Sequence, residues 1–201
     1  MKYAVFSPRS LLTMTWWQTE RYKDKDAIIC DGSIRSSKTV SMSIGFILWS
    51  CSCFNGKTFA ICGKTIESLR RNVITQLPTL FEGLCKITER KSENLMVVSL
   101  DGRVNKYYLF GGKDEGSAAL IQGMTLAGVM FDEVALMPRS FVEQALARCS
   151  VEGSKFWFNC NPDSPEHWFY KEWIQKHKKK NALYLHFTME DNKSLSEKVK
   201  K

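Results

Sequence analysis

The segment from Gly32 to Thr39 reads Gly-Ser-Ile-Arg-Ser-Ser-Lys-Thr and differs at one position from the phosphate-loop pattern G-x-x-x-x-G-K-[ST]. It follows an apolar run that predicts a buried strand at residues 26–31, and it precedes a stretch with helical spacing at residues 38–51. In such a strand–loop–helix unit, backbone N–H groups and the start of the helix surround a bound phosphate. The segment therefore predicts a nucleotide site formed by Gly32, Ser33, Ile34, Arg35, Ser36, Ser37, Lys38 and Thr39.

Two side chains of this loop have definite chemical roles. Lys38 would neutralise oxygens of the β- and γ-phosphates, and Thr39 would place its hydroxyl on Mg²⁺. Ser37 is the departure from the pattern, which has glycine at that position. If the backbone there needs a positive φ, serine costs roughly 1–2 kcal/mol. The alternative is a strand–loop–helix turn that matches the pattern by chance.

A second apolar run, from Leu126 to Phe131, ends in two acids, Asp132 and Glu133. The carboxyl ends of strands face the crevice in which open α/β sheets bind ligands. We expect Asp132 to hold Mg²⁺ through a water and Glu133 to act as the general base on the attacking water. Solvated acids at the end of a strand are the alternative. The phosphate loop upstream argues against that alternative, because the two motifs complete one site.

Amide side chains provide further candidates. Asn159 and Asn161 lie at the end of a strand predicted at residues 155–159, where either could contact the γ-phosphate. Asx-turn chemistry beside Pro162 explains them equally well. Gln18 follows two tryptophans and could read the edge of an adenine, whereas the competing interpretation is an amphipathic helix whose tryptophans belong to the core.

Three arginines are candidates for stabilising negative charge in a phosphoryl-transfer transition state: Arg35, Arg139 and Arg148. Arg35 lies inside the loop and could act within its own chain. Arg148 ends a helix predicted at residues 140–149. Surface salt bridges explain each of the three equally well.

The remaining pattern alternates strands and helices. Helices are also predicted at residues 10–22, 65–81 and 165–177. Ser10 is the expected N-cap of the first of these, and Pro78 interrupts the second. Further strands are predicted at residues 58–62, 95–100, 104–110 and 182–187. Asp101-Gly102 is typical of a two-residue hairpin turn. Right-handed βαβ crossovers then give an α/β fold of the P-loop NTPase type, in which a mostly parallel sheet is flanked by helices and has an antiparallel hairpin at one edge.

Charge and cysteine content restrict the partners and the cellular compartment that we expect for this chain. The net charge is +8, and residues 171–201 contain nine lysines against four acids, which favours a polyanionic partner such as nucleic acid or a solvated basic surface. Seven cysteines, most of them in apolar runs, indicate reduced thiols in a cytosolic protein. We find no signal-peptide core and no apolar stretch long enough to span a bilayer, so we expect a soluble intracellular protein.

Taken together, these segments resemble the large subunit of phage terminases, especially the prophage type. The matching stretches are Gly32–Thr39, Ile121–Gly128, Phe131–Pro138 and Asn159–Trp168, in the order and spacing of the family. The phosphate loop and the acidic pair are generic to P-loop ATPases, whereas the stretches at 131–138 and 159–168 are much more specific. The resemblance covers roughly residues 18–187.

The resemblance implies an ASCE-type ATPase domain over residues 1–201 that uses ATP and Mg²⁺ to move double-stranded viral DNA into a procapsid. It implies self-association into a ring on a portal protein, a small terminase subunit as partner, no membrane, and a location in the cytoplasm of the bacterial host. It assigns Lys38 and Thr39 to phosphate and Mg²⁺, Asp132 to the metal and Glu133 to catalysis. It also places Asn161 in a coupling motif and Gln18 at the adenine.

Two departures limit what the resemblance transfers. Many family members have an arginine where this chain has Gln122, so an arginine supplied between subunits from that position is not expected. Large subunits continue into an RNase-H-like nuclease domain, and no cluster of acids follows the last predicted strand, so the chain is not expected to cut DNA. The rival functions are another DNA-dependent P-loop NTPase, such as a helicase, and a catalytically degenerate, basic remnant that binds DNA or a partner.

Overall fold

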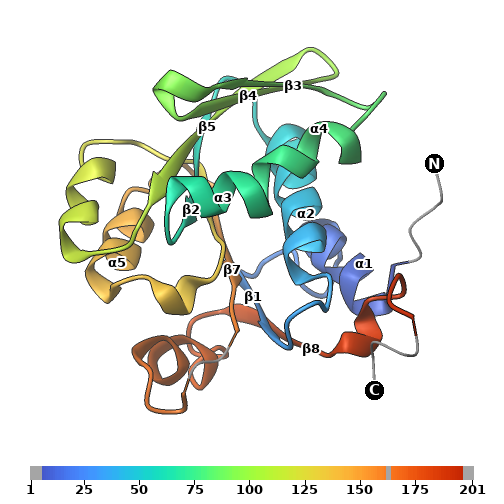
Figure 1. Ribbon diagram of the computed structural model, residues 1–201, viewed down its shortest axis with the longest axis vertical. Coiled ribbons are helices and arrows are strands. Elements are labelled where there is room, and N and C mark those ends of the chain that lie inside the picture. Colours follow the sequence, from blue (N-terminus) through green and yellow to red (C-terminus); the bar gives the residue numbers. More distant parts are fainter. Residues whose placement is uncertain (1–5, 162–163, 197–201) are drawn as a thin grey trace.

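The computed structural model describes residues 6–161 and 164–196, and its centre is an eight-stranded sheet in the order β3-β4-β5-β2-β6-β7-β1-β8 (Figure 1). The strands are β1 (Ala27–Gly32), β2 (Thr58–Gly63), β3 (Lys86–Arg90), β4 (Leu95–Leu100), β5 (Arg103–Gly111), β6 (Gly128–Phe131), β7 (Lys155–Asn159) and β8 (Ala182–Phe187). All neighbours from β5 to β8 pair in parallel, whereas β4 is antiparallel to β3 and to β5. This confirms the predicted mostly parallel sheet with antiparallel strands at one edge.

The central strands are mostly apolar, as expected where helices cover both faces of a sheet. The helices are α1 (Pro8–Thr15), α2 (Lys38–Cys53), α3 (Ile66–Asn72), α4 (Leu77–Leu80) and α5 (Arg139–Ala147). Short helical segments of other types are η1 (Trp16–Gln18), η2 (Ile74–Gln76), η3 (Lys91–Glu93), η4 (Glu115–Ile121), η5 (Val134–Leu136), η6 (Tyr170–Ile174) and η7 (Met189–Asp191). Helix α2 lies against one face of the sheet and α5 against the other (Figure 1).

Each face has its own core. On the face of α2, Phe46 and Trp49 pack with Trp157 of β7, with ring centroids 5.8 and 5.9 Å from that indole. Gly45 lets α1 approach α2 closely, because a Cβ there would lie 2.8 Å from the carbonyl oxygen of Thr13. On the other face, Phe158 stacks on Phe131 of β6 and belongs to the core cluster that includes the buried residues of α5. Alternate residues of one strand thus anchor both layers.

Three predicted helices have different bounds in the structure. Helix α1 begins at Pro8 and is capped by Ser7, whose Oγ accepts from the amide of Ser10, so Ser10 is not the N-cap. The helix predicted at 65–81 breaks at Val73, and Pro78 lies in the first turn of α4, where a missing N–H costs little. Within the segment predicted as a helix at 165–177, η6 is one π-helical turn.

Strand β3 was not among the predicted elements. Its residues alternate between exposed and half-buried, and the exposed positions are Lys86, Thr88 and Arg90. A charged strand of this kind is typical of a sheet edge, where charge blocks pairing with another chain. The hairpin between β4 and β5 is confirmed, since Leu100 pairs with Arg103 and both turn residues have a positive φ.

No disulfide joins the seven cysteines, which all lie in the described part of the chain; Cys53 is exposed, whereas Cys30, Cys51, Cys62 and Cys160 are buried. No helix in the described part of the chain combines the length and the apolar character that crossing a membrane requires.

Candidate nucleotide-binding site

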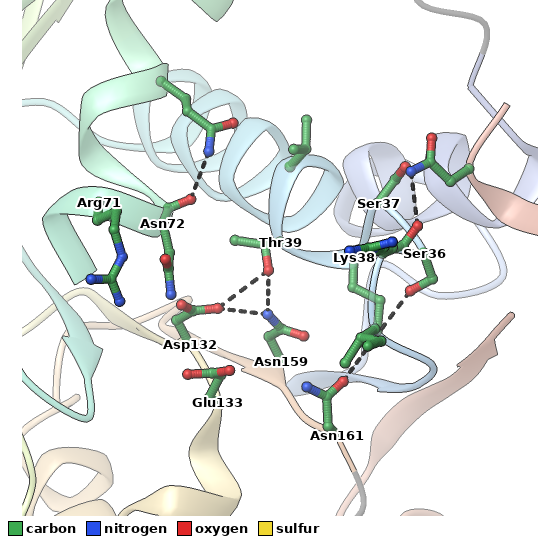
Figure 2. Close-up of a pocket in the computed structure, with 15 residues that line it drawn as sticks. Ser36, Ser37, Lys38, Thr39, Arg71, Asn72, Asp132, Glu133, Asn159 and Asn161 are labelled. Carbon is green, nitrogen blue, oxygen red and sulfur yellow. Dashed lines mark hydrogen bonds between the residues drawn. The ribbon is translucent and has the colours of Figure 1, made fainter. Parts of the chain in front are cut away.

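The predicted motifs meet at the carboxyl ends of three adjacent strands, β6, β7 and β1, where they border a cavity of about 500 Å³. Figure 2 shows the side chains that converge there. The cavity is lined by Ile34, Arg35, Ser36, Ser37, Lys38, Thr39, Val40, Arg71, Asn72, Gln76, Asp132, Glu133, Asn159, Asn161 and Asn192. The phosphate loop and the acidic pair, separated widely in sequence, therefore share one site.

The backbone of the loop is held in conformations that favour glycine. Gly32 has φ 121°, and a Cβ there would lie only 2.0 Å from the carbonyl oxygen of Phe187 on β8. That same carbonyl accepts the amide of Ser33 at 3.1 Å. Ser37, at the position where the pattern has glycine, has φ 70° and ψ 10°. The left-handed conformation considered from the sequence is thus adopted here by a serine.

Lys38 begins α2 and turns its amine back into the loop. Its Nζ donates to the carbonyl oxygens of Gly32 at 3.1 Å and Ser33 at 2.6 Å, and to Ser36 Oγ at 3.2 Å. It also donates to Asn161 Oδ1 at 3.0 Å, and this bond joins the start of α2 to the segment that follows β7. None of these four acceptors is an anion, and the lysine is only 5% exposed. Burial accordingly lowers the pKa of Lys38, against the opposite effect of nearby acidic groups. A buried ammonium surrounded by neutral oxygens is suited to receive a phosphate.

Asp132, Asn159 and Thr39 form a triangle at the other side of the loop (Figure 2). Asn159 Nδ2 donates to Asp132 Oδ1 at 2.6 Å and to Thr39 Oγ1 at 2.7 Å, and Thr39 Oγ1 donates to Asp132 Oδ1 at 3.4 Å. Burial raises the pKa of Asp132, while the hydrogen bond from Asn159 acts in the opposite direction. The Thr39 hydroxyl and the Asp132 carboxylate are therefore preassembled side by side.

This pair of oxygen ligands fits Mg²⁺. Magnesium in nucleotide sites is usually held by one or two protein oxygens, by waters and by the phosphates of the substrate. In the described part of the chain, no group of three or more His, Cys, Asp or Glu side chains is arranged to hold a metal ion by itself. The donor set thus matches a metal that arrives with a phosphate ligand.

Glu133 follows Asp132 and has φ 57° and ψ 53°, a left-handed conformation that is uncommon outside glycine, asparagine and aspartate. It is half-buried and lines the same cavity. Strain of this kind collects at functional positions when the surrounding fold enforces it. Here it lets two successive residues, which an extended strand would direct to opposite faces, both reach the cavity (Figure 2).

Two predicted site residues lie elsewhere. Gln18 is exposed in η1, whose neighbour Trp16 contacts Lys155, the first residue of β7. This is the amino end of the strands, roughly 17 Å from the loop at about 3.3 Å per residue of β1. The carbonyl of Arg148 pairs with the amide of Leu126, just before β6, so this arginine is also at the amino end. Neither Gln18 nor Arg148 is among the residues that line the cavity.

The arginines of the loop and of α5 differ in position. Arg35 lines the cavity, is exposed and has φ 58°, while its carbonyl accepts from Asn192 Nδ2 at 2.8 Å. Arg139 pairs with Glu143 on the surface of α5 at 2.6 Å and does not line the cavity. Of the arginine candidates from the sequence, only Arg35 is therefore at the site.

Four polar lining residues were not foreseen: Arg71, Asn72, Gln76 and Asn192. Asn72 lies on the side of the cavity where Asp132 lies, and its side chain acts against the burial that raises the pKa of this acid. These residues carry no motif and belong to segments that resemble ordinary helix or turn in sequence. The sheet order sets β2 beside β6, which brings Arg71, Asn72 and Gln76 to the cavity, and β8 beside β1, which brings Asn192 there.

Comparison with known proteins agrees with this geometry. Residues 29–201 match the family model described as "Terminase large subunit, T4likevirus-type, N-terminal". A large terminase from a thermophilic bacteriophage is 52% identical with a TM-score of 0.93, over 97% of this chain and 48% of that one. A further structure of the same phage terminase, in complex with ATP-gamma-S, is 50% identical with a TM-score of 0.91, over 97% and 48% of the two chains.

The large terminase ATPase domain of Thermus phage P74-26 shares the fold at 15% identity, with a TM-score of 0.63 over 87% of this chain and 79% of that one. No curated protein sequence matches significantly. The chain spans about half the length of the large terminase from the thermophilic bacteriophage. From the family match and the likeness in fold, we conclude that the chain belongs to the terminase large subunits of T4likevirus type, in their N-terminal region.

Proposed function

We propose that this chain binds ATP together with Mg²⁺ and hydrolyses it, and that it is the ATPase domain of a motor that moves double-stranded DNA into a procapsid. One observation carries the proposal: Lys38, Asp132 and Glu133 border the same cavity. The similarity to a large terminase crystallised with ATP-gamma-S supports ATP as the nucleotide.

Each group of residues at the cavity has its own role in the proposed hydrolysis. Backbone amides of the loop and the start of α2 bind the β-phosphate, and Lys38 exchanges neutral acceptors for phosphate oxygens. Thr39 and Asp132 would hold Mg²⁺, which would supply positive charge to the phosphates. Glu133 orients the attacking water and accepts its proton.

Asn161 is the proposed link between the nucleotide and the rest of the domain. It accepts a hydrogen bond from Lys38 at 3.0 Å and follows β7 by two residues. When Lys38 turns to phosphate, Asn161 loses that donor and is free to contact the γ-phosphate. Loss of the phosphate would reverse the exchange, so the end of β7 responds to the state of the nucleotide.

The proposed partners are double-stranded DNA, further copies of the chain in a ring on a portal protein, and a small terminase subunit, all in the cytoplasm of the bacterial host. The family supports them, and so does the net charge of +8. Lys178, Lys179 and Lys180 are exposed and lie between η6 and β8, where they could contact DNA phosphates. The proposed domain extent, residues 1–201, includes this basic segment.

The test is Glu133→Gln, which keeps the shape and removes the base. We expect steady-state ATP hydrolysis to fall by at least about a hundredfold while ATP binding persists. Glu143→Gln on the surface of α5 is the matched control and should hydrolyse normally. Unchanged hydrolysis in Glu133→Gln contradicts the assignment. Tight ATP binding by the unmodified chain without any hydrolysis, with or without DNA and in assembled oligomers, favours the degenerate remnant.

A further inference from the structure

The cavity has a second wall that the loop and the acidic pair do not account for. Helix α3 follows β2, which neighbours β6 in the sheet, so the end of α3 lies near the strand that carries Asp132 and Glu133. Figure 2 shows Arg71 and Asn72 on this last turn, on the side of the cavity where the two acids lie. Arg71 therefore shares the cavity with the proposed base and metal ligand.

Arg71 differs sharply from the arginine beside it. Arg70 Nε donates to Glu89 Oε1 at 2.6 Å and its Nη2 donates to Asn94 Oδ1 at 2.9 Å, which fixes α3 to the β3–β4 edge. Asn72, the next residue, lines the cavity together with Asp132. Arg71 lies between Arg70 and Asn72, is exposed, and makes no hydrogen bond or ion pair with the described residues. The turn is thus anchored through Arg70, whereas the guanidinium of Arg71 has no other assignment.

Sheet order distinguishes Arg71 from Arg35, the other arginine at the cavity. Arg35 follows β1, and its carbonyl is bound by Asn192, which follows β8 at the edge of the sheet. Glu133 follows β6, separated from β1 by β7. Arg71 approaches from the β2 side, next to the water-activating end of the site.

We propose that Arg71 contacts the terminal phosphate of bound ATP within the same chain and stabilises the negative charge that develops during hydrolysis. This inference rests on the proposed ATPase function. In the reaction, the water oxygen bonds to the γ-phosphorus, the bond from that phosphorus to the bridging oxygen breaks, and the water proton passes to Glu133. ADP and inorganic phosphate leave. Arg71 transfers no proton, and its planar donors bind two phosphate oxygens at once.

Arg71→Ala and Arg71→Lys, made in the whole chain, test this role by kinetics. We expect kcat for ATP to fall at least about a hundredfold in both variants, with little change in KM, because the interaction strengthens in the transition state. Lysine should not restore the rate, since an ammonium cannot reproduce the bidentate contact. Arg139→Ala, which removes another exposed arginine that lies outside the cavity, is the control and should retain kcat.

A binding measurement separates this role from a structural one. In Arg71→Ala, affinity for Mg²⁺-ADP with aluminium fluoride, which mimics the transition state, should weaken far more than affinity for Mg²⁺-ATP-gamma-S. Unchanged kcat and unchanged analogue affinity overturn the inference, as does an equal loss for both ligands. If Glu133→Gln is inactive while Arg71→Ala is fully active, only this inference fails. If the unmodified chain and Glu133→Gln behave alike, the proposed function itself fails.

Discussion

Ser37 shows how a single residue departs from a motif without disturbing its geometry. The backbone at Ser37 is left-handed, and its side chain caps no backbone group of α2. The Cβ therefore costs roughly 1–2 kcal/mol, with no capping interaction to offset it. The serine carbonyl still accepts the amide of Ser41 at 3.0 Å, so the first turn of the helix is intact. The departure affects stability more than the shape of the site.

Ser37→Gly should therefore stabilise the chain. Relief of the left-handed strain exceeds the roughly 0.4–1 kcal/mol that glycine loses through greater freedom when unfolded. We expect a net gain of about 0.5–1 kcal/mol and a rise in Tm of roughly 2–3 °C, measured by thermal unfolding, with unchanged nucleotide affinity. Gly32→Ala is the opposite comparison, because its Cβ would collide with the Phe187 carbonyl, and it should lower Tm. A lower Tm in Ser37→Gly would show that the hydroxyl has a stabilising role.

At the scale of elements, η7 connects the start of α1 to the phosphate loop. Asp191 accepts the amide of Thr188 at 2.9 Å and pairs with Arg9 Nη1 at 3.0 Å. The next residue, Asn192, holds the carbonyl of Arg35. Burial alone would raise the pKa of Asp191, but the Thr188 amide, Ser7 and Arg9 outweigh it, so that pKa lies below its ordinary value of 3.8.

Asp191→Asn should lower the free energy of unfolding by about 1–2 kcal/mol at neutral pH, since it removes charge-assisted hydrogen bonds from a buried side chain. The native pKa is depressed, so this stabilisation is fully present above the ordinary pKa of 3.8 and disappears as the pH falls through the lower native value. Urea unfolding of both proteins across this range measures it. Glu143→Gln, which breaks an exposed pair, should show no difference at any pH. A constant difference down to the lowest pH would exclude the charge as its cause.

At the scale of the whole molecule, the site and the core share one helix. Helix α2 presents Lys38 and Thr39 at its first turn and buries Phe46 and Trp49 against Trp157 in the middle of the sheet. Binding at the first turn should therefore be transmitted to the stability of the whole fold. The same arrangement attaches the loop to a helix that is packed into the core.

Mg²⁺-ADP should raise the Tm of the unmodified chain. At a concentration about a hundred times Kd, linkage gives about 2.7 kcal/mol, which corresponds to roughly 5–10 °C for a domain of this size. Removing Mg²⁺ with EDTA should reduce the rise, and Lys38→Ala should abolish it. Tryptophan fluorescence during thermal unfolding reports the transition, because Trp49 and Trp157 are both buried in this core. A Tm that does not change with nucleotide concentration would contradict the proposed site.

Local signals in the sequence were sufficient for the features that depend on neighbouring residues. The β1–loop–α2 unit, the strand ending in Asp132 and Glu133, and the hairpin at Asp101-Gly102 were predicted and are present. In each, backbone conformation and side-chain spacing are specified within about ten residues. Strand β3 was missed because an exposed edge strand buries too little apolar surface to show a clear alternation.

The tertiary structure alone decided which side chains accompany the loop. Gln18 and Arg148 are close in sequence to elements of the site but lie at the amino ends of the strands, whereas Arg71 and Asn192 come from segments without a motif and line the cavity. Strand order and the direction in which each helix crosses the sheet set these positions, and both depend on packing between residues far apart in the chain. The sequence by itself determined the chemistry of the phosphate loop and the acidic pair. The fold determined which other residues lie beside them, because no short stretch of sequence specifies which residues become neighbours across a sheet.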